Sequence, residues 1–77
     1  MAKLPRVRGK VLVKVLERGG YEVSHVRGSH FYLHKPGVAA LVGVPVHGNR
    51  DLPPGTLRSI LHQARLSTED LVALLGE

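Results

Sequence analysis

The sequence contains no cysteine and no tryptophan, and its only aromatic residues are two tyrosines and one phenylalanine. Without cysteine there are no disulfide bonds and no thiolate metal ligands, which fits a protein of the cytoplasm. No apolar run approaches the roughly 20 residues of a membrane-spanning helix. The apolar run at residues 11–16 follows positive charge, as in a signal peptide, but Lys14 interrupts it and no small-residue cleavage site follows.

Carboxylates are scarce, which argues against a metal-dependent nuclease. Such an enzyme usually brings several carboxylates together on a divalent cation. Asp51 stands alone in its loop, whereas the acidic pair at 69–70 suits the first turn of a helix. His30 and His34 lie four residues apart on an expected strand, about 13 Å, which is too far to share one ion. A contribution from His25 across the hairpin is the remaining zinc alternative, and we expect neither a metal nor a cofactor.

Positive charge is concentrated in the first 66 residues. All 11 Lys and Arg lie there, whereas residues 67–77 hold three of the six Asp and Glu. The net charge is +5 and the isoelectric point is about 10.3. A compact body this basic attracts polyanions, of which nucleic acid is the commonest. A solvated basic surface without a nucleic-acid partner is the alternative.

Hydrophobic periodicity divides the chain into six elements in the order helix, three strands, helix, helix. The expected helices span residues 10–18, 53–64 and 67–76, and the expected strands span residues 21–27, 29–34 and 41–46. Short connections between the strands predict an antiparallel meander. The sequence therefore predicts an α+β fold of the form α-β-β-β-α(α), with the helices packed on one face of a three-stranded sheet. We expect residues 1–77 to form one domain, with residues 1–8 as a flexible basic arm.

Alternation along the strands predicts one covered and one open sheet face. The face expected to meet the helices carries Phe31, Leu33, Val44 and Val46. The face expected to meet water carries His30, Tyr32 and His34. The first strand alternates imperfectly, so a twist or bulge is expected near His25. Pro45 cannot donate a ladder hydrogen bond, which indicates an edge strand or an N–H position that faces an edge.

Metal-free RNA cleavage suits this set of side chains. RNA carries its own nucleophile, the 2′-hydroxyl, so an enzyme needs a base, an acid for the leaving 5′-oxygen, and cations for the phosphate. Imidazole, with an unperturbed pKa of about 6.5, suits the first two roles, and Arg or Lys suits the third. DNA lacks the 2′-hydroxyl, so this chemistry selects RNA. His30, directly after a Gly-Ser turn, is the best candidate for the base, although strand position alone favours an exposed histidine without a role.

Three further features are candidates for RNA contacts. The loop at 48–50, with the start of the next helix and Arg58, suits a phosphate, or it is simply a capped loop–helix junction. Tyr32 suits either base stacking, worth about 1–3 kcal/mol per base, or simple covering of the sheet. His47 suits either a phosphate contact or the capping of a turn.

The sequence resembles the HicA family of toxins in four segments. They are residues 28–30 (Gly-Ser-His), 44–49 (Val-Pro-Val-His-Gly-Asn), 55–61 (Gly-Thr-Leu-Arg-Ser-Ile-Leu) and 16–21 (Leu-Glu-Arg-Gly-Gly-Tyr). Each motif is weak alone, but their order and spacing in a chain of this length are specific. The resemblance covers residues 9–72.

The resemblance implies a fold similar to the double-stranded-RNA-binding domain and a type II toxin that cleaves mRNA as a metal-independent endoribonuclease. His30, the histidine of the Gly-Ser-His motif, is the implied catalytic residue. The implied partners are mRNA and a cognate, HicB-like antitoxin that covers the active face, with no membrane and no direct DNA contact, and the implied location is the cytoplasm. The residues expected to hold RNA are Lys10, Lys14, Arg27, Ser29, Tyr32, His47, Arg50 and Arg58.

Several alternatives stay open in the sequence. The second catalytic group is His47, Arg27 or water. Residue 65 is Arg where the family often has Gly after the second helix, which leaves the end of this helix undetermined. An RNA-binding module of the same fold, without catalysis, is the alternative function. An interaction protein whose basic face docks an acidic partner is a further rival.

Overall fold

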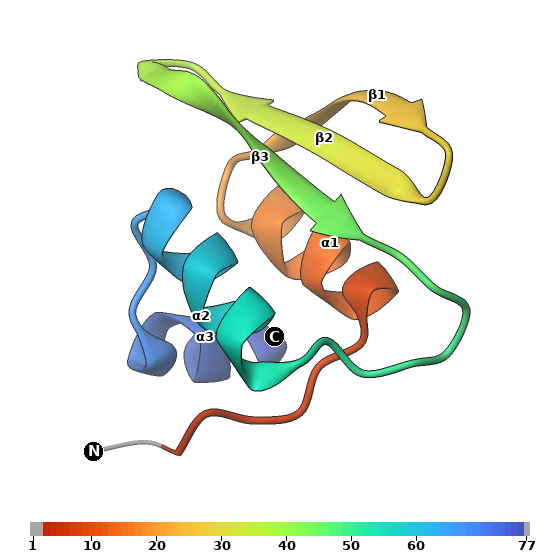
Figure 1. Cartoon of the computed structure of the whole chain (residues 1–77). Helices are drawn as coiled ribbons and strands as arrows, with labels where there is room; N and C mark the ends of the chain where they lie inside the picture. Colours follow the sequence, from red (N-terminus) through yellow and green to blue (C-terminus); the bar gives the residue numbers. More distant parts are fainter. Residues whose placement is uncertain (1–2, 77) are drawn as a thin grey trace.

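The computed structural model describes residues 3–76 of the chain, which contain three helices and three strands (Figure 1). The helices are α1 (Gly9–Arg18), α2 (Pro54–Gln63) and α3 (Thr68–Leu75), and the strands are β1 (Glu22–Arg27), β2 (His30–Lys35) and β3 (Val38–Pro45). Their order confirms the predicted α+β fold. None of the helices in residues 3–76 has the length and apolarity needed to cross a membrane.

The strands form one antiparallel sheet in the order β1-β2-β3, as the short connections predict. β3 lies at an edge, which suits Pro45. It begins earlier than predicted because Val38 pairs with Lys35 directly across the turn. The predicted irregularity of the first strand is a register shift between Val23 and His25.

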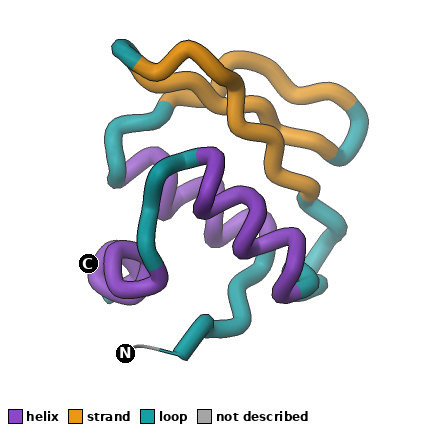
Figure 2. The backbone as a smooth tube through the Cα atoms, turned by 60° about the vertical axis from the view of Figure 1, so that its left-hand side comes forward, coloured by secondary structure: helices purple, strands orange, loops and turns teal. Residues whose placement is uncertain are grey.

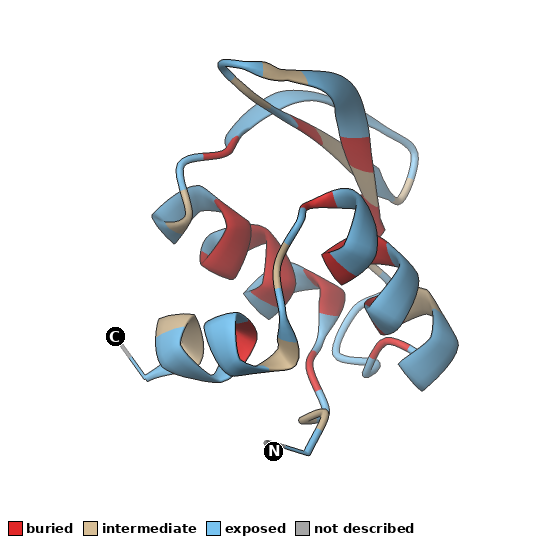
Figure 3. Ribbon diagram, turned by 90° about the vertical axis from the view of Figure 1, so that its left-hand side faces the viewer, coloured by how far each residue is buried: buried red, intermediate tan, exposed pale blue. Residues whose placement is uncertain are grey.

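The helices all lie on one side of the sheet (Figure 2). α1 and α2 contact the sheet, and α3 packs against α1. Leu33, Val42 and Val44 are fully buried between these layers, whereas Phe31 and Val46 are half-buried at the margin (Figure 3). The covered face of the sheet is therefore the one predicted. The core comprises Val7, Leu12, Val13, Val15, Leu16, Tyr21, Leu33, Val42, Val44, Leu52, Leu57, Ile60, Leu61, Ala64 and Leu71.

β1 contributes nothing to this core, because all six of its residues are exposed. Val23 and Val26 pair with Leu33 and Phe31, and cross-strand partners point to the same side of a sheet. Even so, they remain 37% and 51% exposed. The helix layer therefore leaves an apolar strip beneath β1 uncovered.

The segment before α1 differs from the flexible basic arm expected over residues 1–8. Val7 is only 2% exposed, and its carbonyl oxygen accepts a hydrogen bond of 2.8 Å from the Leu52 N–H. The backbones of Arg8 and Asp51 form an isolated antiparallel β-bridge. Val7, which lies between Arg6 and Arg8, therefore anchors this segment to the fold. Residues 1–2 lie outside the described part of the chain.

α3 begins with a capping box, and the acidic pair at 69–70 lies in its first turn as predicted. The Asp70 N–H donates to Ser67 Oγ at 3.0 Å, and the Ser67 N–H donates to Asp70 Oδ2 at 2.9 Å. The backbone bond from Ser67 and then its hydroxyl lower the pKa of Asp70, because both stabilise the carboxylate. Ser67 and Asp70 therefore cap the N-terminus of α3.

Arg65 ends α2 in the left-handed region, with φ of 58°. The Leu66 N–H donates to the Leu61 carbonyl at 2.9 Å and the Arg65 N–H donates to the His62 carbonyl at 3.1 Å. This pair of bonds is a Schellman motif, whose left-handed position favours glycine because a Cβ clashes there. The structure thus explains why glycine suits this position.

We expect Arg65→Gly to raise the free energy of unfolding by about 1 kcal/mol, because it removes that clash. In a domain of this size the change corresponds to a rise of about 4–8 °C in Tm, measured by circular dichroism. Arg65→Ala is the matched control, because it removes the side chain but keeps the Cβ. Equal Tm values for the two variants would show that the backbone at residue 65 is not strained.

Candidate active site

The sheet face opposite the helices carries the polar side chains that alternation predicts there. His30 and Tyr32 on β2 are the direct partners of Arg27 and His25 on β1, so all four share this face. His30 and Arg27 are exposed, and Tyr32 is half-buried. The open face therefore combines imidazole, phenol and guanidinium groups from two strands.

Aromatic rings form a row across this face. The rings of His25 and Tyr32 stack with centroids 4.7 Å apart and planes at 15°. The His30 ring follows at 6.3 Å from Tyr32, and the His47 ring lies 6.5 Å from His30 with its plane at 88°. A Cβ at Gly43 would lie 3.2 Å from a Tyr32 ring carbon, so glycine lets this ring lie against β3.

Backbone contacts fix the position of His30. The turn before it uses Gly28 with φ of 60°, a conformation that glycine adopts readily. The next carbonyl, of Ser29, accepts a hydrogen bond of 2.7 Å from the Val46 N–H. His30 itself pairs with Pro45 in the β2–β3 register. The same contacts place His47, one residue after Val46, at the same end of the sheet.

A hollow of about 370 Å³ lies next to His47, at the start of α2. Arg50 and Thr56 contribute polar side chains to its lining, together with Asp51. The Arg50 N–H donates to the His47 carbonyl at 3.1 Å, which closes the turn between them. Helix N-terminal N–H groups favour an anion, so a phosphate would find a cation and the start of a helix here.

Lys10 and Lys14 lie away from His30. They line a hollow of about 340 Å³ between α1 and the covered side of the sheet. Its other lining residues are Val13, Glu17, Val23, Phe31 and Val46. Lys10 and Lys14 therefore border the apolar strip beneath β1, on the side opposite the aromatic row.

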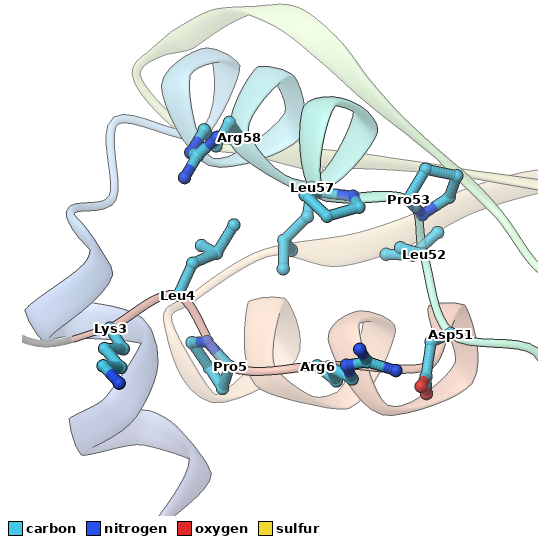
Figure 4. A pocket seen from close by; sticks show the side chains of 10 residues that line it. Lys3, Leu4, Pro5, Arg6, Asp51, Leu52, Pro53, Leu57 and Arg58 are labelled. Atoms are coloured by element: carbon cyan, nitrogen blue, oxygen red, sulfur yellow. The ribbon is translucent and has the colours of Figure 1, made fainter.

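Arg58 is also separate from the aromatic row. It lines a hollow of about 660 Å³ between α2 and the N-terminal segment, where it faces Lys3 and Leu4 (Figure 4). Of the residues predicted to contact RNA, Arg27, Ser29, Tyr32 and His47 lie next to His30, and Arg50 lies beside His47. The other three lie on different surfaces.

No group of three or more His, Asp or Glu side chains in residues 3–76 is arranged to hold a metal ion. His34 lies toward the other end of β2, where its Nε2 is 3.8 Å from Glu22 Oε2. That pair is exposed, so water and salt screen it.

Two features of the site were not predicted from the sequence. One is the hydrogen bond between Ser29 and Val46, and the other is the stack of His25 on Tyr32. The bulge expected near His25 hinted at the stack, because a register shift decides which face that side chain takes. Nothing in the hydrophobic pattern signals the hydrogen bond.

The fold and site together define a small α+β domain with one covered sheet face and one open sheet face rich in histidine. The chain belongs to the HicA family, toxins of bacterial toxin–antitoxin systems. The family model matches residues 9–66, well over half of the 77-residue chain, and confirms the resemblance. The match includes both His30 and His47. No curated protein matches the sequence.

Proposed function

We propose that this toxin is a metal-independent endoribonuclease that cleaves mRNA, with His30 as its catalytic residue. The observation that carries the proposal is the placement of His30, exposed on the open sheet face beside Arg27 and held by the backbone contact between Ser29 and Val46. Membership of the HicA family supports it, because the Gly-Ser-His motif of that family ends at this histidine.

His30 acts as the general base or the general acid of the reaction. As a base, its neutral imidazole takes the proton of a 2′-hydroxyl, and as an acid, its imidazolium protonates the leaving 5′-oxygen. Arg27 is the cross-strand partner of His30, so its guanidinium lies beside the imidazole and can balance the growing negative charge on the phosphate. The chemistry needs no group outside the chain and its substrate.

The RNA contacts of the open face have a consistent arrangement. Tyr32 is half-buried and leaves part of its ring open to a base, while Ser29 precedes His30 and Arg50 follows His47 in the chain. We assign the direct contacts to Arg27, Ser29, Tyr32, His47 and Arg50. Lys10, Lys14 and Arg58 act at longer range, because their charges raise the local concentration of a polyanion without touching the site.

A cognate antitoxin of the HicB type is the proposed protein partner. An antitoxin that covers the open face blocks RNA from His30, and an acidic surface suits the charge of that face. The mRNA substrate places the reaction in the cytoplasm.

The test compares RNA and DNA of the same sequence in EDTA, with purified protein free of antitoxin. We expect cleavage of the RNA only, because the DNA lacks the 2′-hydroxyl that serves as nucleophile. The products are read on a denaturing gel.

Cleavage of the DNA as well as the RNA would contradict this mechanism. RNA that is retained in a salt-dependent way but never cut would instead support a binding module without catalysis.

A further inference from the structure

His30 and His47 form a pair at one end of the open face. Their ring centroids are 6.5 Å apart and their planes are nearly perpendicular, at 88°. Both side chains are exposed, so a substrate can reach both. They come from different segments, β2 and the loop after β3, and only the folded sheet brings them together.

The backbone fixes the spacing of this pair. The hydrogen bond from Val46 to Ser29 joins the residues that directly precede the two histidines, at 2.7 Å. A second bond, from the Arg50 N–H to the His47 carbonyl at 3.1 Å, closes the turn that follows. Fixed spacing matters because acid–base groups are effective only when both lie within hydrogen-bond reach of the reacting atoms.

The two rings are close enough to serve one phosphodiester. Their centroids are 6.5 Å apart, so one substrate group lying over the pair can contact a nitrogen of each ring. Arg27, the other side chain near His30, is a poor alternative acid because a guanidinium does not release its proton in proteins. An imidazolium releases its proton near neutral pH.

We propose that His30 and His47 are the acid–base pair of the RNA-cleaving reaction, one taking the proton of the 2′-hydroxyl and the other protonating the 5′-oxygen. The inference rests on the proposed function. The 2′-oxygen bonds to phosphorus and its proton passes to the neutral imidazole. The bond from phosphorus to the 5′-oxygen breaks, and that oxygen takes the proton of the imidazolium. The products are a 2′,3′-cyclic phosphate and a 5′-hydroxyl, and solvent then restores the protonation of both rings.

The hollow beside His47 extends the pair toward the start of α2. Arg50 and Thr56 line it, so a neighbouring phosphate or sugar of the RNA has polar partners there.

The test uses a short RNA that contains one site already mapped with the parent protein. A second RNA carries sulfur in place of the 5′-oxygen at that site, because a thiolate leaves without a proton. We expect His47→Ala to slow cleavage of the ordinary RNA by about 10²- to 10⁴-fold. We expect the sulfur substrate to restore, to within about tenfold of the parent rate, whichever of His30→Ala and His47→Ala lacks the acid, and to leave the other slow.

Each outcome of this test is decisive. Restoration of only one variant supports the pair and assigns the acid, whereas parent-like cleavage by His47→Ala, or the same response of both variants to sulfur, overturns it. His47→Gln repeats the measurement should His47→Ala fail to fold, as checked by circular dichroism. His62→Ala, an exposed histidine on α2, is the matched control and should cleave like the parent. An uncut RNA with the parent itself would contradict the proposed function instead.

Discussion

Replacing His30 with alanine is expected to slow RNA cleavage by about 10²- to 10⁴-fold, the usual contribution of a general acid or base. The reason is that the proton of the 2′-hydroxyl or of the leaving oxygen loses its partner, while the phosphate contacts remain. Because His30 is exposed, its removal leaves the core intact. The rate is measured under single-turnover conditions on one RNA, with binding of the same RNA measured separately.

The control for this experiment is His62→Ala, which removes an exposed imidazole from α2. It should cleave at the parent rate, and both variants should unfold near the parent Tm. His30→Ala should also relieve the toxicity of the protein when it is expressed without antitoxin. A His30→Ala protein that cleaves at the parent rate would exclude His30 as the catalytic residue.

Gly9→Ala is expected to destabilise the domain by about 3 kcal/mol or more, at the upper end of the cost of overpacking. A Cβ at this first residue of α1 would lie 2.1 Å from the Pro45 carbonyl oxygen and 3.1 Å from the Val46 Cα. Both atoms belong to backbone, so neither can swing aside, and α1 must separate from β3. A fall of about 12–24 °C in Tm follows for a domain of this size.

Gly55→Ala is the matched control, because it adds the same methyl group to the start of α2, where nothing lies within 4 Å. Alanine in a helix is more favourable than glycine, so this variant should be about 0.5–1 kcal/mol more stable than the parent. Thermal unfolding of the three proteins tests both expectations. A Gly9→Ala protein with the parent Tm would show that α1 and β3 are not in close backbone contact.

The architecture was largely predictable because its elements have strong periods. Alternation over residues 29–34 assigned Leu33 to the core and His30 and Tyr32 to the open face, and the structure agrees. The acidic pair at 69–70 marked the first turn of α3 in the same local way. These signals are carried by neighbouring residues, so they do not depend on how the chain folds back on itself.

Other features depend on distant parts of the chain and were predicted less well. Val7 is buried because Leu52 lies beside it, and a local pattern of cations around one valine gives no sign of that. Val23 remains exposed beside a hollow that residues of α1 line but do not fill. A hydrophobic pattern shows which side chains would be buried, but not whether a helix is available to cover them.

The same distinction explains the candidate site. His30 and His47 were singled out separately, but the order of their segments did not place them 6.5 Å apart. That spacing comes from the register in which His30 faces Pro45 and from the bond between Ser29 and Val46. Lys10 and Lys14 were expected to contact RNA, but the fold places them on α1 away from His30, beside a different hollow.

The most direct test of the central claim is cleavage of one long unstructured RNA in EDTA by the antitoxin-free protein, with His30→Ala beside it. The account predicts fragments with the parent protein and intact RNA with the variant. RNA that both proteins bind and neither cuts would contradict catalysis and leave a binding module.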